Sequence, residues 1–329
     1  MYINDLAFAD LFVGDTPVSS WMKPSTSSLV RTHVPQVLHG ELLALREALL
    51  IGHFEHKGRP FYFKWGSEST RSYRVTSIQT IHDKPLFVCR SHLPSPKSLL
   101  ELNWPPSICD YLMRQPVKDG LFLFMGAMGA GKTTSAASFV VQQVSTFGGV
   151  AMTIEYPQEM DLEGEWGKGS IYQTEIESEA VLGEALRGML GSSANLLYPS
   201  EIKSSDSANE VVNLGLTGHP IVSTIHAPNL ADGLLRFSRL LSSQNDGLAG
   251  ALRAAFYIQM PPNDPLTPAP KDAPVLLVDE VKPVKPIIRP LFMLPDTKDA
   301  ICSNIRSGNF AFLNNEIDRQ MRLFQGNKL

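Results

Sequence analysis

Nine consecutive residues have the types and spacing needed to hold phosphate. From position 126 to position 134 they read Gly-Ala-Met-Gly-Ala-Gly-Lys-Thr-Thr, which fits G-x-x-x-x-G-K-[ST]. The glycines let the backbone curl so that its N–H groups face phosphate oxygens. Lys132 adds a positive charge, and the Thr133 hydroxyl is placed to ligate Mg²⁺. We predict that ATP or GTP binds with Mg²⁺ at Gly126, Ala127, Met128, Gly129, Ala130, Gly131, Lys132, Thr133 and Thr134.

A phosphate-binding loop of this kind must join a buried strand to a helix. Residues 121–125 form a short apolar run that is typical of a buried parallel strand. From residue 133 to residue 144 apolar side chains recur at helical spacing, as at Ala136, Phe139 and Val140. The phosphate is then expected at the N-terminus of this helix, where backbone N–H groups have no partner within the helix.

Two carboxylates and one histidine follow apolar runs further along the chain. Glu155, Glu201 and His226 come at or shortly after the ends of three such runs. Because the carboxyl ends of parallel strands line the ligand crevice of an open sheet, these side chains can converge near the γ-phosphate. Hydrolysis needs a group that positions or deprotonates the attacking water. Considered singly, each Glu could instead be solvated, and His226 could be a buried structural histidine.

The pattern divides the chain into two regions joined by a short connection. Residues 1–95 combine an amphipathic stretch at 39–50 with short strands, which indicates an α+β domain. Residues 96–106 are proline-rich at both ends and favour an interdomain linker. Residues 107–329 alternate strands and helices, and this α/β pattern predicts a mostly parallel sheet covered on both faces.

The end of the chain is expected to be less regular. Residues 261–274 are rich in proline and predict an exposed loop. Two apolar stretches, 275–278 and 287–294, could pair as a hairpin, and residues 310–324 predict a helix.

Composition excludes several classes of protein. With 329 residues, 43% hydrophobic and 19% charged, the chain fits a globular protein of two domains. A net charge of −4 without a basic run argues against broad nucleic-acid binding. No apolar run approaches the ~18 residues that span a bilayer, and the N-terminus lacks the features of a secretory signal. The three scattered cysteines indicate a reducing compartment and no zinc site.

The ordered set of motifs resembles the traffic ATPases of type IV pili and of type II and type IV secretion, in particular the short PilT-like members. Residues 126–134 match the family's Walker A motif, and residues 154–159 match its "Asp box". Residues 196–204 match its unusual Walker B motif. Thr217-Gly218-His219 and Thr224-Ile225-His226 follow in the family's order. Weaker matches are Gln173-Thr174-Glu175, residues 184–187, residues 300–308 and residues 9–14.

The resemblance implies an N-terminal PAS-like domain followed by a RecA-like ATPase domain, and it implies roles for the site residues. Glu201 would be the general base or would position the water, and Glu155 would assist at Mg²⁺ or the water. His226 would sense the γ-phosphate of ATP, with His219 supporting the same crevice. A turn role for His219, which precedes a proline, is the alternative.

Two arginines of the N-terminal region match positions where the family has arginine fingers. Arg74 corresponds to the second arginine of R-F-R-V, and Arg90 to the arginine of F-R-T. Such residues neutralise transition-state charge. The alternative places both arginines at a solvated sheet edge.

The chain departs from the family pattern around these motifs. Tyr156 replaces an aspartate, and Lys203 keeps a charge where arginine is usual but loses its bidentate geometry. We expect hydrolysis to survive, with subunit coupling or regulation altered. The remaining departures are Ser72, Gly191, Ser204 and Cys302.

Together these features predict a cytoplasmic ring ATPase, a hexamer by resemblance, that acts on an inner-membrane platform protein in type IV pilus retraction. A DotB/TraJ-type ATPase of type IVB secretion or conjugation is an alternative within the family. An ATP-binding regulatory subunit with weak hydrolysis is an alternative of another class, and a nucleic-acid-dependent RecA-like motor is disfavoured by the acidic balance.

Overall fold

The computed structural model describes residues 1–24, 31–67, 70–92, 96–241, 245–261 and 285–325. The chain forms two compact units, each described here by itself. Unit 1 holds Met1–Ser95 together with Pro157–Asp161. Unit 2 holds Pro96–Tyr156, Leu162–Pro261 and Val284–Leu329.

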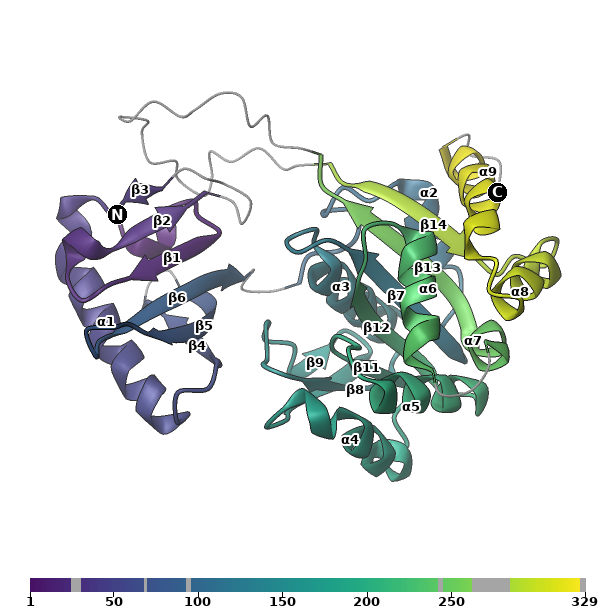
Figure 1. Ribbon diagram of the computed structural model, residues 1–329, viewed down its shortest axis with the longest axis horizontal. Coiled ribbons are helices and arrows are strands. Elements are labelled where there is room, and N and C mark those ends of the chain that lie inside the picture. The colour runs from purple at the N-terminus through teal and green to yellow at the C-terminus, as the bar shows by residue number, and fades with distance from the viewer. Residues whose placement is uncertain (25–30, 68–69, 93–95, 242–244, 262–284, 326–329) are drawn as a thin grey trace. The chain divides into compact units, whose positions relative to one another are not determined.

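Unit 1 is an antiparallel sheet with one long helix packed on it (Figure 1). The strand order is β3-β2-β1-β6-β5-β4, and every pairing is antiparallel. Leu42, Leu45 and Leu49 of the helix are buried in one cluster with Tyr73 and Phe87 of the sheet. The elements are β1 (Asp10–Val13), β2 (Trp21–Lys23), β3 (Thr32–His33), α1 (His39–Glu55), β4 (Phe61–Trp65), β5 (Arg71–Gln79) and β6 (Pro85–His92).

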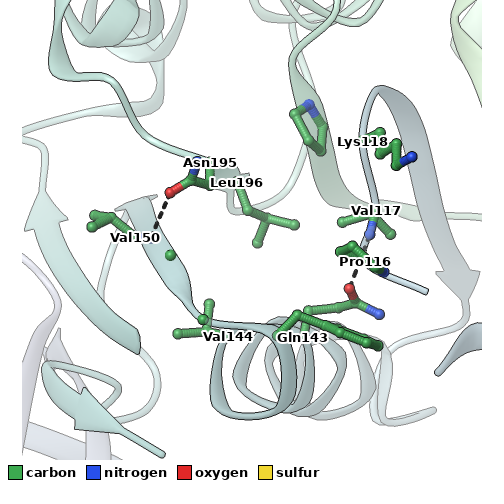
Figure 2. A pocket seen from close by; sticks show the side chains of 12 residues that line it. Pro116, Val117, Lys118, Gln143, Val144, Val150, Asn195 and Leu196 are labelled. Carbon is green, nitrogen blue, oxygen red and sulfur yellow. Dashed lines mark hydrogen bonds between the residues drawn. The ribbon is translucent and has the colours of Figure 1, made fainter. Parts of the chain in front are cut away.

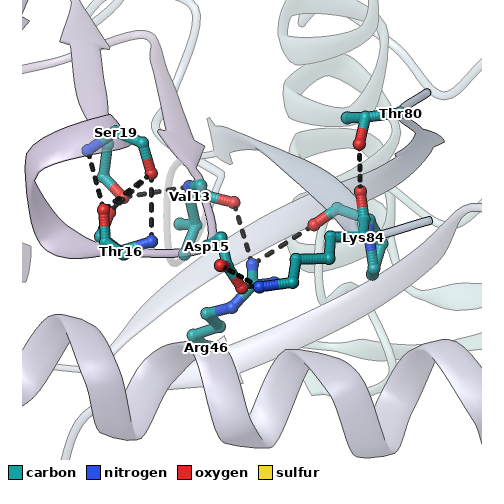
Figure 3. A network of polar contacts seen from close by, with 10 residues as sticks. Val13, Asp15, Thr16, Ser19, Arg46, Thr80 and Lys84 are labelled. Atoms are coloured by element: carbon teal, nitrogen blue, oxygen red, sulfur yellow. Dashed lines mark hydrogen bonds and ion pairs between the residues drawn. The ribbon is translucent and has the colours of Figure 1, made fainter. Parts of the chain in front are cut away.

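A buried arginine ties the helix of unit 1 to the ends of two strands (Figure 3). Arg46 donates to the backbone oxygens of Val13, at 3.4 Å, and Pro85, at 3.2 Å. Its guanidinium also pairs with Asp15 at 3.3 Å, and Lys84 contacts the same carboxylate. The hydrogen bond from Lys84, helped by Arg46, holds the pKa of Asp15 below its usual value. This network fixes α1 against β1 and β6.

Unit 2 contains a mostly parallel sheet, as the alternating pattern predicts (Figure 1). The strand order is β14-β13-β7-β12-β11-β8-β10-β9, parallel from β13 to β10 and antiparallel at both edges. The strands are β7 (Gly120–Gly126), β8 (Gly149–Glu155), β9 (Gly164–Trp166), β10 (Gly169–Glu175), β11 (Leu196–Pro199), β12 (Pro220–His226), β13 (Leu252–Gln259) and β14 (Ile287–Phe292).

Helices cover both faces of this sheet because its central strands are apolar on both sides. Alternate residues of β7 face opposite ways: Phe122 and Phe124 contact Phe139 of α3, whereas Leu121 and Leu123 join the core beneath α4, α5 and α6. The helices are α2 (Pro106–Leu112), α3 (Lys132–Phe147), α4 (Leu182–Gly188), α5 (Ser205–Leu216), α6 (Leu230–Leu240), α7 (Asp246–Ala251), α8 (Lys298–Arg306) and α9 (Leu313–Gln325).

The predicted fold class is confirmed: an α+β N-terminal domain precedes a RecA-like P-loop domain. The helix predicted at 39–50 continues to Glu55 as α1, and the one predicted at 310–324 is present as α9. The stretch 287–294 contains β14, but this strand pairs with β13, which the sequence analysis did not identify. Residues 275–278, its predicted partner, and the predicted loop from residue 262 onward lie outside the described residues.

The proline-rich stretch 96–106 is packed into unit 2. Leu99 and Trp104 are buried, and the Trp104 ring contacts Phe124 and Phe256 of the sheet. The indole N–H donates to the Ser135 hydroxyl at 3.2 Å. At least this part of the stretch therefore belongs to the core of unit 2 and does not act as a free spacer.

Replacing Trp104 by alanine tests this placement. Because the ring is 2% exposed and packs on two sheet aromatics, Trp104→Ala should lower the free energy of unfolding of unit 2 by about 3–5 kcal/mol. Urea unfolding followed by circular dichroism measures the change. Tyr172→Ala, at a half-exposed position of β10, is the matched control. Equal midpoints for the two variants would contradict the packing of Trp104.

Candidate nucleotide-binding site

The strand order of unit 2 brings four sequence motifs together at the carboxyl ends of its central strands. Strands β7, β12, β11 and β8 are consecutive neighbours and run parallel, so their carboxyl ends lie side by side. The phosphate loop follows β7, His226 ends β12, Glu201 comes two residues after β11, and Glu155 ends β8. The carboxyl edge of such a sheet is where open α/β folds bind their ligands.

The phosphate loop has the backbone shape that its glycines permit. Gly129 and Gly131 have φ of 74° and 86°, in the left-handed region that side chains disfavour. A Cβ at Gly126 would meet the backbone oxygen of Ile258 at 2.5 Å, so only glycine fits there. Gly131 is the N-cap of α3, whose first N–H groups have no partner within the helix. This is a cradle for phosphate oxygens at a helix N-terminus.

A chain of hydrogen bonds joins the loop lysine to the carboxylate after β11. Lys132 is 6% exposed and its Nζ lies 3.0 Å from the Ala127 backbone oxygen and 3.1 Å from His226 Nδ1. His226 Nε2 lies 3.2 Å from Glu201 Oε1. An ammonium group only donates, so Nδ1 accepts from Lys132 and Nε2 carries the proton that His226 donates to Glu201.

The surroundings of Glu201 keep its carboxyl group ionised. Burial by itself would raise its pKa, but the hydrogen bond from His226 and the charges of Lys203 and Lys132 outweigh burial. The pKa of Glu201 therefore lies below its ordinary value. Lys203 Nζ is 3.4 Å from Glu201 Oε2, so lysine still contributes its charge where the traffic ATPases resembled by sequence have arginine. An ionised carboxylate in this place can bind or deprotonate a water molecule.

The second predicted carboxylate, Glu155, has a different environment. It is 3% exposed, and its Oε1 accepts hydrogen bonds from Thr153 Oγ1 and Gln173 Nε2, both at 2.8 Å. Neither Thr153 nor Lys203 was predicted to be a partner in the site. Gln173 was noted only as part of a motif. The parallel pairing of β8 with β10, which brings Gln173 beside Glu155, could not be seen in the sequence.

His219 does not join this cluster within one chain. It stands immediately before β12, and its backbone oxygen accepts from Gly120 N, the first residue of β7, at 3.1 Å. Its ring contacts the Thr217 hydroxyl at 3.3 Å. Since β12 runs from this end to His226, the two histidines are separated by about 20 Å of strand. Within one chain His219 therefore lies at the far end of β12 from this cluster, and its predicted support of the crevice stays a prediction.

Arg74 and Arg90 lie directly opposite each other on β5 and β6 of unit 1, on the same face of the sheet. Arg74 pairs with Glu159 at 3.1 Å, and Arg90 pairs with the buried Asp10 at 2.8 Å. Their strands are interior strands, so the alternative of a solvated sheet edge does not hold. Both guanidinium groups have carboxylate partners here, and their approach to a nucleotide stays a prediction.

A bound Mg²⁺ would have to rely on the nucleotide for most of its ligands. Among the described residues, no group of three or more His, Cys, Asp or Glu side chains could hold a metal ion. Thr133 follows Lys132 at the start of α3, where its hydroxyl can supply one oxygen ligand. Magnesium commonly takes a few protein ligands and completes its shell with phosphates and water. The Thr133 hydroxyl beside the phosphate loop therefore fits a Mg²⁺ ion whose remaining ligands come from the nucleotide and water.

Several departures from the resembled motifs have structural roles. Ser204 is the N-cap of α5, where its hydroxyl accepts from Ser207 N at 3.3 Å. Cys302 is buried, and its Sγ contacts the Ala249 backbone oxygen at 3.3 Å. A Cβ at Gly191 would meet no atom within 4 Å, so nothing in its surroundings requires glycine.

A hollow of about 380 Å³ lies at the amino ends of the parallel strands, opposite the end that carries the phosphate loop (Figure 2). It is lined in part by the first residues of strands, including Gly149, Leu196 and Pro220. Two side-chain oxygens accept hydrogen bonds from backbone N–H groups in its lining: Asn195 Oδ1 accepts from Val150 N, and Gln143 Oε1 accepts from Val117 N. Because it lies at the amino ends of the parallel strands, this hollow is separate from the phosphate loop.

The sequence matches proteins of secretion and pilus machines. Residues 96–258 match the family Type II/IV secretion system protein. Type II secretion system protein HxcR of Pseudomonas aeruginosa is 27% identical over 167 residues, 50% of this chain and 34% of that protein. Type IV pilus assembly ATPase TfpB of Acinetobacter baylyi is 32% identical over 123 residues, 37% of this chain and 20% of that protein. The matches thus cover at most about a third of the lengths of these curated relatives.

Solved structures with the same fold cover nearly the whole chain. The Legionella pneumophila ATPase DotB superimposes with a TM-score of 0.68 at 18% identity, over 93% of this chain and 84% of that one. The pilus retraction motor PilT, determined with bound ADP, gives a TM-score of 0.69 at 16% identity, over 97% of this chain and 90% of that one. At these identities the likeness concerns the fold.

The described residues contain no helix that is both long and apolar enough to cross a membrane. The phosphate loop, the carboxylates at the strand ends and the family match over residues 96–258 agree with one another. Over residues 96–258 the chain carries a domain of the type II/IV secretion system protein family.

Proposed function

We propose that this chain hydrolyses ATP and uses the energy to drive type IV pilus retraction. The observation that carries the proposal is the hydrogen-bonded chain from Lys132 through His226 to Glu201. It links the phosphate-binding lysine to an ionised carboxylate, the two groups that binding and hydrolysis respectively require.

Each residue of the site has a separate role in the proposed hydrolysis. The N–H groups of the loop and of the start of α3 hold the phosphates, and Thr133 ligates the accompanying Mg²⁺. Lys132 exchanges its contacts with Ala127 and His226 for the β- and γ-phosphates. His226 is then released on its Nδ1 side and can sense the γ-phosphate. Glu201 orients or deprotonates the attacking water, and Glu155 assists at the metal ion or the water.

Arg74 and Arg90 are the proposed arginine fingers. Arg74 and Arg90 are opposite each other on one face of the sheet, and once released from their carboxylate partners they would present two positive charges that suit a triphosphate. Each group must exchange a carboxylate partner, Glu159 or Asp10, for phosphate oxygens. Such an exchange would couple nucleotide state to movement of unit 1, which is how a rigid-body work stroke is produced.

The identity of the pilus or secretion machine goes further beyond the observed site than any other part of the proposal. A homohexameric ring at the cytoplasmic face of the inner membrane, acting on a platform protein, is what the resemblance to PilT-like motors implies. The fold of PilT supports it, and the fold of DotB equally supports a type IVB secretion or conjugation ATPase. A regulatory subunit with weak hydrolysis is less favoured because Glu155 and Glu201 are both present and held in place.

Removing the carboxylate after β11 tests the assignment of the catalytic base. Glu201→Gln keeps the size of the side chain and should lower kcat for phosphate release on the order of 10²–10⁴-fold, because a general base is lost. Binding of fluorescent ADP should stay within about twofold, because the phosphate loop is untouched. Glu184→Gln, on the exposed face of α4, is the control. Turnover like that of the unchanged protein in Glu201→Gln would refute the role of Glu201.

Removing one proposed finger tests the role of unit 1. Arg74→Gln should lower kcat on the order of 10³-fold while ADP still binds, because a charge that stabilises the transition state is missing. Lys64→Gln removes the ion pair between Lys64 and Asp161, which like the Arg74–Glu159 pair reaches residues 157–161, and serves as the matched control. Steady-state phosphate release by the assembled protein is measured. Equal rates for both variants would show that Arg74 is structural.

The lowered pKa of Glu201 has a consequence for stability at acid pH. A carboxyl group whose folded pKa is depressed contributes stability that is present in full above its unfolded pKa, near 4.5. That contribution is lost as pH falls through the folded pKa. The unfolding free energy of the unchanged protein relative to Glu201→Gln should therefore be constant from pH 7 to pH 5.5 and decline below about pH 4.5. A relative stability that rises on acidification, measured by urea unfolding, would contradict this electrostatic arrangement.

A further inference from the structure

Glu155 is oriented by a residue to which neither the resemblance nor the proposed mechanism gives a role. We propose that Gln173 is a positioning residue for ATP hydrolysis, which acts through Glu155 and does not itself touch the nucleotide. The inference rests on the proposed function, because it assumes that Glu155 takes part in hydrolysis.

The sheet brings Gln173 to Glu155 from a neighbouring strand. β10 pairs in parallel with β8, and Gln173 is in register with Thr153, two residues before Glu155. From there the Gln173 side chain reaches the carboxylate, with Nε2 at 2.8 Å from Oε1 of Glu155. All three residues belong to unit 2.

The other end of the Gln173 amide fixes which way the group faces. Its Oε1 accepts hydrogen bonds from two consecutive backbone N–H groups, those of Leu162 and Glu163. A backbone N–H can only donate, so the oxygen of the amide must face these two residues. The NH₂ group is then directed at Glu155. A glutamine meets both demands at once, whereas a glutamate in its place would present a like charge to Glu155.

The bonds to Glu155 converge on one oxygen. Thr153 Oγ1 donates to the same Oε1 at 2.8 Å, from a side chain that is fully buried. Two donors on one oxygen set the rotation of the carboxyl group and with it the direction of Oε2. Glu155 is 3% exposed, so water has little access to replace a lost donor. Partners of this kind orient a catalytic group although they make no contact with substrate.

Gln173 is bonded both to Glu155 and to residues 162–163, which come after Glu155 in the chain. The backbone N–H of Gln173 donates to the Glu163 carboxylate, in addition to the bonds that its side chain accepts from residues 162 and 163. These bonds attach residues 162–163, which follow β8 in the chain, to Gln173 of β10. A displacement of residues 162–163 would move the amide and change the orientation of the carboxylate.

Two substitutions separate positioning from structural support. Gln173→Glu keeps an oxygen for the Leu162 and Glu163 N–H groups but replaces the donor to Glu155 by a like charge. Gln173→Met keeps the length of the side chain and removes both functions. In each variant kcat for phosphate release should fall on the order of 10–100-fold, with the larger loss in Gln173→Glu. Affinity for fluorescent ADP should stay within about twofold of that of the unchanged protein. Tyr172→Phe, at a half-exposed position of the same strand, should leave both values unchanged.

A double-mutant cycle shows whether the effect passes through Glu155. Single-turnover hydrolysis of radiolabelled ATP is followed for Glu155→Gln, for Gln173→Met and for the combined variant. If Gln173 acts only by orienting the carboxylate, its replacement should cause no further loss once that carboxylate is gone. Unchanged kcat in both Gln173 variants, or the same fold-loss in the Glu155→Gln background as in the native one, would overturn the inference. The thermal midpoint of each variant identifies misfolding. If Gln173→Met misfolds, the kcat of Gln173→Glu tests the inference alone, because this variant keeps an oxygen that accepts from the N–H groups of Leu162 and Glu163.

Failure of this inference is distinguishable from failure of the proposed function. If the unchanged protein hydrolyses ATP and Glu155→Gln impairs it while the Gln173 variants do not, only the role of Gln173 is refuted. If the unchanged protein releases no phosphate, or Glu155→Gln hydrolyses normally, the role of Glu155 fails and that of Gln173 fails with it.

Discussion

The parallel alignment of β7, β12, β11 and β8 is the constraint on which the site depends. Each strand delivers one part at its carboxyl end: the phosphate loop, His226, Glu201 and Glu155. Because all four run the same way, a side chain at the beginning of one of these strands lies far from this site within the same chain. His219 illustrates this, since it stands at the beginning of the strand that ends in His226.

The two carboxylates at the strand ends differ in their contacts. Glu201 is surrounded by cationic groups and by His226, and these partners depress its pKa despite burial. Glu155 accepts hydrogen bonds from the neutral side chains of Thr153 and Gln173. Environments that differ in this way commonly separate the roles of paired acidic residues. One of the cations near Glu201, Lys132, belongs to the proposed phosphate loop, so we expect the electrostatics of Glu201 to change if Lys132 turns to phosphate.

Local sequence patterns predicted much of the fold, and long-range pairing accounts for most of what they missed. The loop at residues 126–134 and the apolar runs around it were identifiable because glycine geometry and strand burial leave local signals. The Lys132–His226–Glu201 contacts could be anticipated only as a convergence of strand ends. Gln173 became recognisable as a partner of Glu155 once strand order was known, whereas Lys203 contacts Glu201 from two residues along the chain. Residues 96–106 were misjudged because prolines suggested a linker, whereas Leu99 and Trp104 bury their side chains in unit 2.

The central claim is that the hydrogen-bonded site of unit 2 turns over ATP. Its most direct test is phosphate release by the unchanged, assembled protein with ATP, in the presence of Mg²⁺ and of excess EDTA. The account predicts repeated turnover that depends on Mg²⁺, because Thr133 and the phosphate loop require the metal–nucleotide complex. Tight ATP binding without phosphate release over many hours would contradict it and would indicate a nucleotide-gated regulatory subunit.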